Sequence, residues 1–147
     1  MVEKIVNSMK TEFCAKSVNE SFARTAVAAF ASQADPSIAV IADIKTAVSE
    51  AVTNAIVHAY ADFEDRQRCM IYINCKLTES NKLIIKIKDK GRGIEDVNTA
   101  MQPLFTTDTD GERSGMGFTI MESFTDGIRV RSVIGKGTTV TLEKRLG

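Results

Sequence analysis

Three polar side chains recur at every fourth position of one segment: Glu50, Asn54 and His58. In a helix, this spacing places them along one face. A carboxylate can accept a proton from an attacking hydroxyl, and an amide oxygen one turn away can bind Mg²⁺. An ordinary solvated helix face has the same pattern, and a lone histidine beside an apolar stripe usually has a local hydrogen-bond partner. Glu50 and Asn54 are therefore the candidate reactive residues, and we expect His58 to be structural.

A second candidate site follows a strand-like run, at Asp89, Gly91 and Gly93 of the sequence DKGRG. An aspartate at the end of a strand can accept a hydrogen bond from an amino group such as that of adenine. The glycines lack a Cβ and let the backbone approach a flat ring closely. A simple glycine turn after a strand explains this pentapeptide as well.

Glycines also precede a predicted helix, in the sequence SGMG at 114–117. Backbone N–H groups at a helix start suit phosphate oxygens, although a flexible loop or a helix cap explains the pattern about as well. Other nucleotide signatures are missing, because there is no GxxxxGK[ST] motif and Asp96 replaces the third glycine of a GxGxxG motif. Thr138 begins the last predicted strand, where its hydroxyl can reach a buried ring or a water molecule, or where β-propensity alone accounts for it.

The elements that position these residues follow from hydrophobic periodicity. We expect helices over 17–33, 38–60 and 117–124, and strands over 11–16, 70–77, 83–88, 127–134 and 138–142. In the first helix, Ser17 is the expected cap, and Phe22, Ala26, Ala29 and Phe30 are the expected core face. The glycine-rich stretch 90–117 has little periodicity and is expected to be a functional lid. These elements predict an α/β (α+β) two-layer sandwich, with helices on one face of a mixed, mainly antiparallel sheet.

The composition fits a single domain over residues 1–147, since 44% of the residues are hydrophobic. Nineteen basic residues balance nineteen acidic ones, so no net positive charge draws the chain to nucleic acid or to an anionic membrane. The amino terminus lacks the apolar stretch of a signal peptide, and no apolar run approaches the roughly 20 residues of a spanning helix. We therefore expect a cytoplasmic protein whose partners are proteins and small ligands.

The order of these motifs resembles that of one protein family. An ExxxN helix, DxGxG after a strand, GxG before a helix and a terminal GTT resemble the GHKL family of ATPases and kinases, which has the Bergerat fold. This family includes the gyrase and Hsp90 nucleotide domains, the catalytic domains of histidine kinases and the small anti-sigma serine kinases. Four longer strings are similar to the anti-sigma-F kinases of sporulating bacteria: NESFAR at 19–24, SEAVTNAIVHAY at 49–60, QPLFTT at 102–107 and ERSGMGFTIME at 112–122.

The resemblance implies a role for each matching residue. Glu50 would be the general base that activates a serine hydroxyl, and Arg113 would support the terminal phosphate of ATP. Asn54 would be the Mg²⁺ ligand, and Asp89 would bind adenine. The other nucleotide-binding candidates would line the adenine pocket or contact the phosphates: Gly91, Gly93, Thr106, Thr107, Ser114, Gly115, Met116, Gly117 and Thr138.

Two departures from the family pattern affect the expected pocket. Lys90 and Arg92 stand where similar proteins often have acidic or small residues, so the charge at the pocket mouth would differ. The lid sequence DTDG at 108–111 is acidic, which leaves the geometry of its closure open.

The same resemblance implies a serine protein kinase that is also an anti-sigma factor. It would bind ATP and Mg²⁺, form ADP, phosphorylate a serine of an anti-anti-sigma factor and bind a sporulation sigma factor. Glu20 and Arg24 are the expected sigma contact, although a surface ion pair explains them as well. A homodimer is implied too, with the open edge of strand 11–16 as its candidate interface. Two alternatives remain, namely a nucleotide-dependent binding module without significant kinase activity and the ATPase domain of a histidine kinase.

Overall fold

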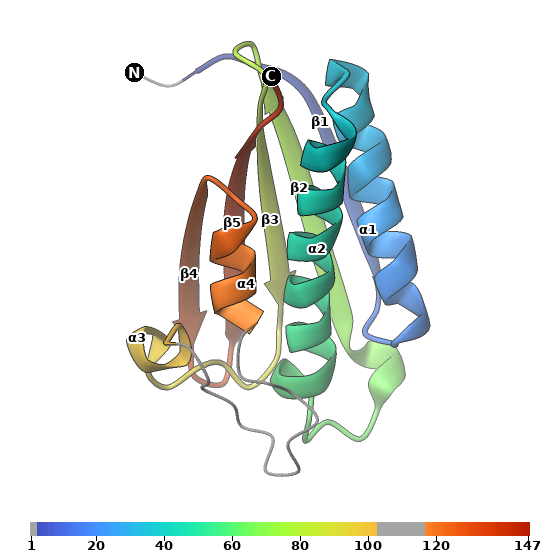
Figure 1. Cartoon of the computed structure of the whole chain (residues 1–147). Helices are drawn as coiled ribbons and strands as arrows, with labels where there is room; N and C mark the ends of the chain where they lie inside the picture. Colours follow the sequence, from blue (N-terminus) through green and yellow to red (C-terminus); the bar gives the residue numbers. More distant parts are fainter. Residues whose placement is uncertain (1–2, 103–116) are drawn as a thin grey trace.

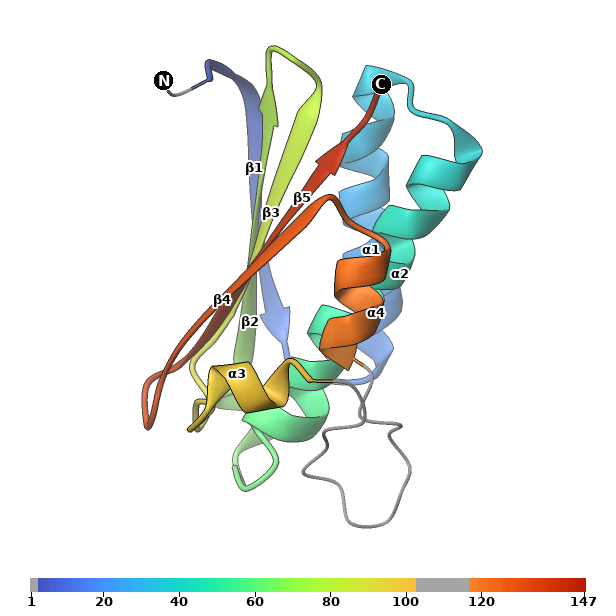
Figure 2. The ribbon, with the colours of Figure 1, turned by 60° about the vertical axis from the view of Figure 1, so that its left-hand side comes forward.

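In the computed structural model, which describes residues 3–102 and 117–147, helices pack on one face of a five-stranded sheet (Figures 1 and 2). The strands are β1 (Ile5–Cys14), β2 (Met70–Thr78), β3 (Lys82–Asp89), β4 (Gly127–Val133) and β5 (Gly137–Arg145). Their order in the sheet is β1-β2-β3-β5-β4, and each pairing among them is antiparallel. The expected two-layer α+β architecture is confirmed, with no parallel pairing among the described strands.

Figure 2 shows the three longer helices on the same side of the sheet. The helices are α1 (Val18–Ala31), α2 (Ile38–Asn54), α3 (Val97–Ala100) and α4 (Gly117–Ser123). Short 3₁₀ turns occupy Ser32–Ala34 and Arg66–Arg68, and a π-helical turn occupies Ala55–Ala59. No helix in the described part of the chain has the length and apolar character needed to cross a membrane.

Helix α2 forms where the sequence predicts it. Its N-terminal cap is Ser37, whose hydroxyl accepts a hydrogen bond from the Val40 N–H at 3.1 Å. Its apolar stripe, which includes Ile44, Val48 and Val52, is almost completely buried against the inner face of the sheet. Burial stabilises the fold by about 1.5–3 kcal/mol for each such side chain, so this interface holds α2 firmly over the sheet.

The amino-terminal part of the structure differs from the prediction in three respects. Strand β1 begins at Ile5 rather than near residue 11, because it pairs with β2 along its whole length. The predicted core face of α1 is only partly correct: Phe30 packs against the core, but Phe22 is 49% exposed, and Ala23 and Val27 are buried instead. Ser17 makes no side-chain capping hydrogen bond. Small residues face inward on α1, which lets this helix lie close to its neighbours.

The predicted helix over 38–60 also changes its winding. It is α-helical only to Asn54 and continues as a π turn, in which the Tyr60 N–H donates to the Ala55 carbonyl at 3.2 Å. A π turn holds more residues than an α turn, so a spacing of four residues no longer returns to the same face. The expected alignment of His58 with Glu50 and Asn54 therefore ends at this turn.

Candidate functional site

The buried carboxylate of Asp89 lies at the end of β3, where that strand meets the start of β5. Asp89 is 6% exposed, and its Oδ1 accepts hydrogen bonds from the Gly91 N–H at 2.9 Å and the Thr138 N–H at 3.2 Å. Burial raises the pKa of Asp89, and the two backbone hydrogen bonds only partly offset that effect. Among the described residues both bonds fall on Oδ1, so Oδ2 can accept a hydrogen bond from a ligand.

Gly91 lies too close to the end of the α2 segment for any side chain. A Cβ at this position would lie 2.3 Å from the Ala59 carbonyl oxygen, which also accepts a hydrogen bond from the Arg92 N–H at 2.9 Å. The DKGRG segment is thus packed directly on the π turn. The glycine here is required by backbone contact, so a simple turn is not its only purpose.

Gly93 and Gly137 adopt backbone conformations that favour glycine. Their φ angles are +82° and +128°, and a Cβ at Gly137 would lie 2.1 Å from the Asp89 carbonyl oxygen. Strands β3 and β5 therefore approach closely at their ends, where Thr138 is 6% exposed and holds Asp89 through its N–H. The predicted grouping of Asp89, Gly91 and Thr138 is present in the structure.

Asn54 lies against the first residue of α4. A Cβ at Gly117 would lie 2.9 Å from Asn54 Nδ2 and 3.0 Å from Oδ1. Gly117 is the second glycine of the GxG motif, so the end of α2 meets the motif that was predicted to bind phosphate. Glu50 precedes Asn54 by one α-helical turn and is half-buried. Asn54 and the last glycine of the motif are thus neighbours in space.

Two residues that support the site carry no recognisable sequence signal. The Ser132 hydroxyl accepts from the Ile94 N–H at 2.7 Å and lies 2.8 Å from the Thr138 hydroxyl. The Tyr60 hydroxyl accepts from the Lys90 N–H at 2.7 Å and donates to the Met70 carbonyl at 2.6 Å. Both side chains fix the segment that follows β3. Ser132 occurs in an unremarkable strand sequence, and Tyr60 appeared only as the last residue of the predicted helix 38–60 and of the family-like string 49–60.

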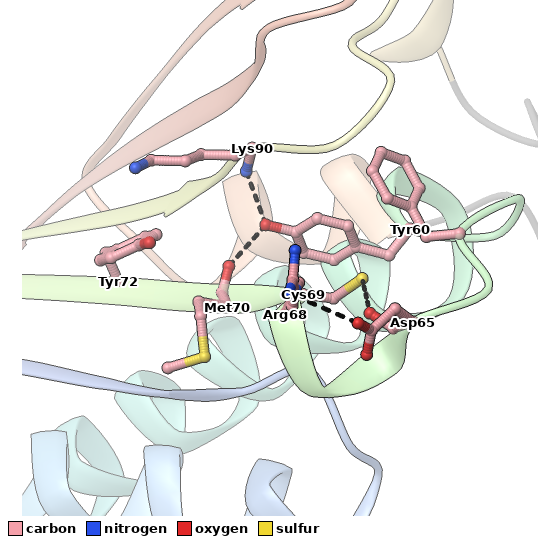
Figure 3. A pocket seen from close by; sticks show the side chains of 8 residues that line it. Tyr60, Asp65, Arg68, Cys69, Met70, Tyr72 and Lys90 are labelled. Carbon is pink, nitrogen blue, oxygen red and sulfur yellow. Dashed lines mark hydrogen bonds and ion pairs between the residues drawn. The ribbon is translucent and has the colours of Figure 1, made fainter.

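A hollow of about 290 Å³ lies beside Tyr60, at the end of the sheet (Figure 3). Its lining includes Tyr72 and Lys90, and the Lys90 Nζ lies 5.0 Å from the centre of the Tyr72 ring. Asn54, Asp89 and Thr138 do not line this hollow, so it is separate from the predicted adenine site. The ammonium of Lys90 therefore faces away from Asp89.

Arg92, the other cationic residue of the DKGRG segment, is also engaged away from Asp89. Arg92 forms an ion pair with Asp62 at 3.2 Å. Neither cationic side chain of the DKGRG segment thus adds its charge directly to the Asp89 carboxylate. The positions of their side chains thus reduce the effect that Lys90 and Arg92 were expected to have on the charge at the mouth of the predicted pocket.

The remaining predicted residues either lie on another helix or fall outside the described part of the chain. Glu20 and Arg24 form an ion pair at 3.2 Å on α1, the helix that lies over β1 and β2 rather than over β5. The lid candidates lie outside the described residues: Thr106, Thr107, Arg113, Ser114, Gly115 and Met116. Within the described ranges, histidines, cysteines and carboxylates form no group of three suited to a metal. A site that offers one amide oxygen fits Mg²⁺, which is usually held by few protein ligands together with substrate phosphates.

Comparison with known proteins identifies the family of the chain. Residues 14–144 match the family model of the histidine kinase-like ATPase domain. The chain is 55% identical over 141 residues to the anti-sigma F factor of Caldanaerobacter subterraneus subsp. tengcongensis, covering 96% of this chain and 95% of that protein. It is also 55% identical over 140 residues to the anti-sigma F factor of Clostridium novyi, covering 95% of each chain.

A solved structure shows the same fold at lower sequence identity. The RsbU and RsbW domains of a Mycobacterium tuberculosis protein superpose with a TM-score of 0.70 at 21% identity, over 96% of this chain and 33% of that one. At this identity the likeness concerns the fold alone. It agrees with the Bergerat fold that the order of the motifs implies.

Proposed function

The chain belongs to the histidine kinase-like ATPase domain family and, within it, to the anti-sigma F factors, and from this premise we propose that it is an ATP-dependent serine kinase. It would phosphorylate a serine of an anti-anti-sigma factor in the cytoplasm, form ADP, and hold a sporulation sigma factor inactive. The observation that carries the proposal is the convergence of three motifs at the carboxyl end of α2, where Asn54 meets Gly117 and Ala59 meets Gly91.

Asp89 is proposed to select adenine. Its Oδ1 is held by two backbone N–H groups, which fixes the direction of Oδ2. A buried carboxylate oxygen is a strong acceptor for an exocyclic amino group, because little water competes for it. The glycines at 91, 93 and 137 allow backbone to lie close around this point.

Glu50 and Asn54 are proposed to act at the phosphate end of the site. The Asn54 amide oxygen would be a ligand of Mg²⁺. The bound ion would neutralise negative charge on the phosphates. Glu50, one turn earlier, would orient the serine hydroxyl of the partner and accept its proton. The positions of Gly117 and Asn54 place a helix N-terminus beside this pair, and its N–H groups would favour phosphate oxygens.

The exchange of Glu50 tests the kinase assignment. The full chain is incubated with labelled ATP, Mg²⁺ and a candidate anti-anti-sigma factor, and phosphoserine on the partner is measured. Glu50→Ala should lower turnover by about 10²- to 10⁴-fold, the usual contribution of a general base, and leave nucleotide affinity nearly unchanged. Glu122→Ala on α4 is the matched control, because this glutamate is exposed and is assigned no role.

Three outcomes of that experiment would contradict the assignment. Unchanged transfer by Glu50→Ala would show that another group activates the serine. Nucleotide binding without label on any protein would favour a nucleotide-dependent binding module. Phosphohistidine would favour a histidine kinase ATPase domain.

The sigma contact and the homodimer are separate parts of the proposal. Arg24→Ala should weaken binding of the sigma factor without affecting the kinase reaction, and unchanged affinity would leave the Glu20–Arg24 pair as a surface ion pair. Strand β1 lies at the edge of the sheet and exposes Val6 to 52%, which supports pairing with a second copy. Sedimentation at micromolar concentration tests for that dimer.

A further inference from the structure

The sheet face that points away from the helices is strongly basic. The five strands carry nine of the nineteen lysine and arginine residues but only three of the nineteen acidic ones. Alternation along the strands directs most of these cations away from the buried core. The chain is neutral overall, yet its charges are therefore separated in space, which the balanced composition did not predict.

Four cations surround two threonines on this face. In the register of the sheet, Lys86 of β3 lies opposite Thr141 of β5, which lies opposite Arg129 of β4. Lys88, Thr139 and Arg131 form the next row in the same way. We call the four cations, Lys86, Lys88, Arg129 and Arg131, the basic quartet. Its corners are about 10 Å apart across the strands and about 7 Å apart along them, from ordinary sheet spacings.

The cations of the basic quartet are exposed and have no carboxylate partner. Lys86, Lys88, Arg129 and Arg131 are all exposed, and they form no ion pair within residues 3–102 and 117–147. Like charges at these distances repel one another, although salt weakens the effect. A ligand that supplied carboxylates at the same spacing would remove this repulsion and form new ion pairs.

We propose that the basic quartet is a docking surface for an acidic helix of a protein partner. Carboxylates that are seven residues apart on a helix are separated by about 10 Å, and those four residues apart by about 6 Å. A helix that lies across the strands would therefore place carboxylates seven residues apart over cations of β3 and β4. A helix that lies along the strands would place carboxylates four residues apart over the two cations of one strand. The hydroxyls of Thr139 and Thr141 lie between the cations and can donate hydrogen bonds to the same carboxylates.

The sheet favours a protein partner over a single-stranded nucleic acid. Nucleic-acid binding on an open sheet relies on aromatic side chains on which bases stack. Tyr72 is the one aromatic residue that the described strands direct to this face, and the Lys90 ammonium already lies over its ring. A second copy of the chain is a poor occupant too, because a two-fold axis through this face would oppose like charges.

The docking surface is independent of the proposed nucleotide site. Asp89 points to the helix side of β3, where it is buried, whereas its neighbour Lys88 is exposed on the other face. A partner on the open face would thus leave the site near Asn54 accessible. The inference goes beyond the proposed function and does not require kinase activity.

The test measures binding of the full chain to a fluorescent, alanine-based helical peptide of about 15 residues, with glutamates spaced four and seven residues apart. The double variant Lys86→Glu/Arg129→Glu should weaken binding by about tenfold or more, since it removes two attractions and adds two repulsions. The matched control, Lys16→Glu/Lys45→Glu, changes the net charge equally at exposed positions away from this face and should bind as the wild type does. Added salt should weaken binding to the wild type.

Other results would overturn the proposal. Equal losses in both double variants would mean that only net charge matters. Tighter binding of a single-stranded oligonucleotide or of anionic vesicles, lost in Lys86→Glu/Arg129→Glu, would assign the face to another class of partner. If the wild type formed an oligomer and only Lys86→Glu/Arg129→Glu were monomeric, this face would be assigned to self-association. Nucleotide affinity, measured in parallel, should be the same in the wild type and in both double variants. A failure of the kinase proposal would appear in that measurement and not in peptide binding.

Discussion

Exchange of Asp89 for asparagine separates the function of this carboxylate from its contribution to stability. Asparagine has nearly the same shape, and its Oδ1 can still accept from the Gly91 and Thr138 N–H groups. The other oxygen becomes an NH₂ group, which is a donor. We therefore expect Asp89→Asn to fold normally and to lose most of its affinity for adenine nucleotides.

The expected loss of affinity follows from one hydrogen bond. A hydrogen bond to a charged group contributes about 1.5–3 kcal/mol, which corresponds to a decrease of about 10- to 150-fold in affinity. The donor that replaces Oδ2 would also face the donor of adenine, so the larger value is the better guide. Titration of the chain with a fluorescent ATP analogue, in parallel with GTP, measures the effect and its base specificity.

Stability should change in the opposite direction. Burial raises the pKa of Asp89 in the folded state, so the ionised wild type is at a disadvantage at neutral pH, and the variant should be at least as stable there. As the pH falls through the folded-state pKa towards the ordinary value of 3.8, the folded wild type gains its proton before the unfolded chain does. The wild type then gains stability relative to Asp89→Asn, and the difference between them should shrink.

Urea unfolding of both proteins over this pH range checks the reasoning. Asp96→Asn is the matched control, because Asp96 is an exposed aspartate whose pKa is lowered by hydrogen bonds with Thr99. Unchanged ATP affinity in Asp89→Asn would refute the assignment of the adenine acceptor. A loss of stability at neutral pH would refute the claim that the carboxylate is kept at a cost to the fold.

Three further predictions concern the surroundings of this site. Tyr60→Phe removes the hydroxyl that joins β2 to the Lys90 N–H, and urea unfolding should show a loss of about 1–3 kcal/mol, because two backbone groups lose their partner; a change below the error of the measurement would contradict this. Gly91→Ala should lose about 1–3 kcal/mol and weaken ATP binding, because its Cβ would lie 2.3 Å from a carbonyl of the π turn. Gly127→Ala, whose Cβ would make ordinary contacts, should lose less in the same assay. Burial raises the pKa of Cys75 to about 12, so this thiol should resist a disulfide reagent at pH 8 until urea unfolds the chain, and early labelling of its peptide would disprove the claim.

The elements that could be predicted from the sequence are those whose pattern records burial directly. The β2–β3 and β4–β5 hairpins show alternating side chains, and α2 shows one continuous apolar stripe. The start of β1 has no such pattern, because its residues are largely exposed and the strand is held by pairing with β2. Long-range pairing of this kind leaves no local signal.

Helix α1 shows a different limit of sequence patterns. Hydrophobicity places phenylalanine in the core, yet Phe22 packs at its surface with its ring edge-on to Phe13, at 5.8 Å between the ring centres. Alanines take the inner face instead. The choice between a large and a small side chain depends on how closely two elements approach, and a single sequence does not contain this distance.

The candidate site combines predictable parts with one feature that only the structure provides. Each glycine motif was recognisable in the sequence, but the sequence did not show that two of the glycines are required by contact with the same helix end. Gly117 accommodates the Asn54 amide, and Gly91 accommodates the carbonyl that ends the π turn at Ala59. Contacts this short leave no room for a side chain at either glycine, so each glycine lets its own segment lie against the end of this helix.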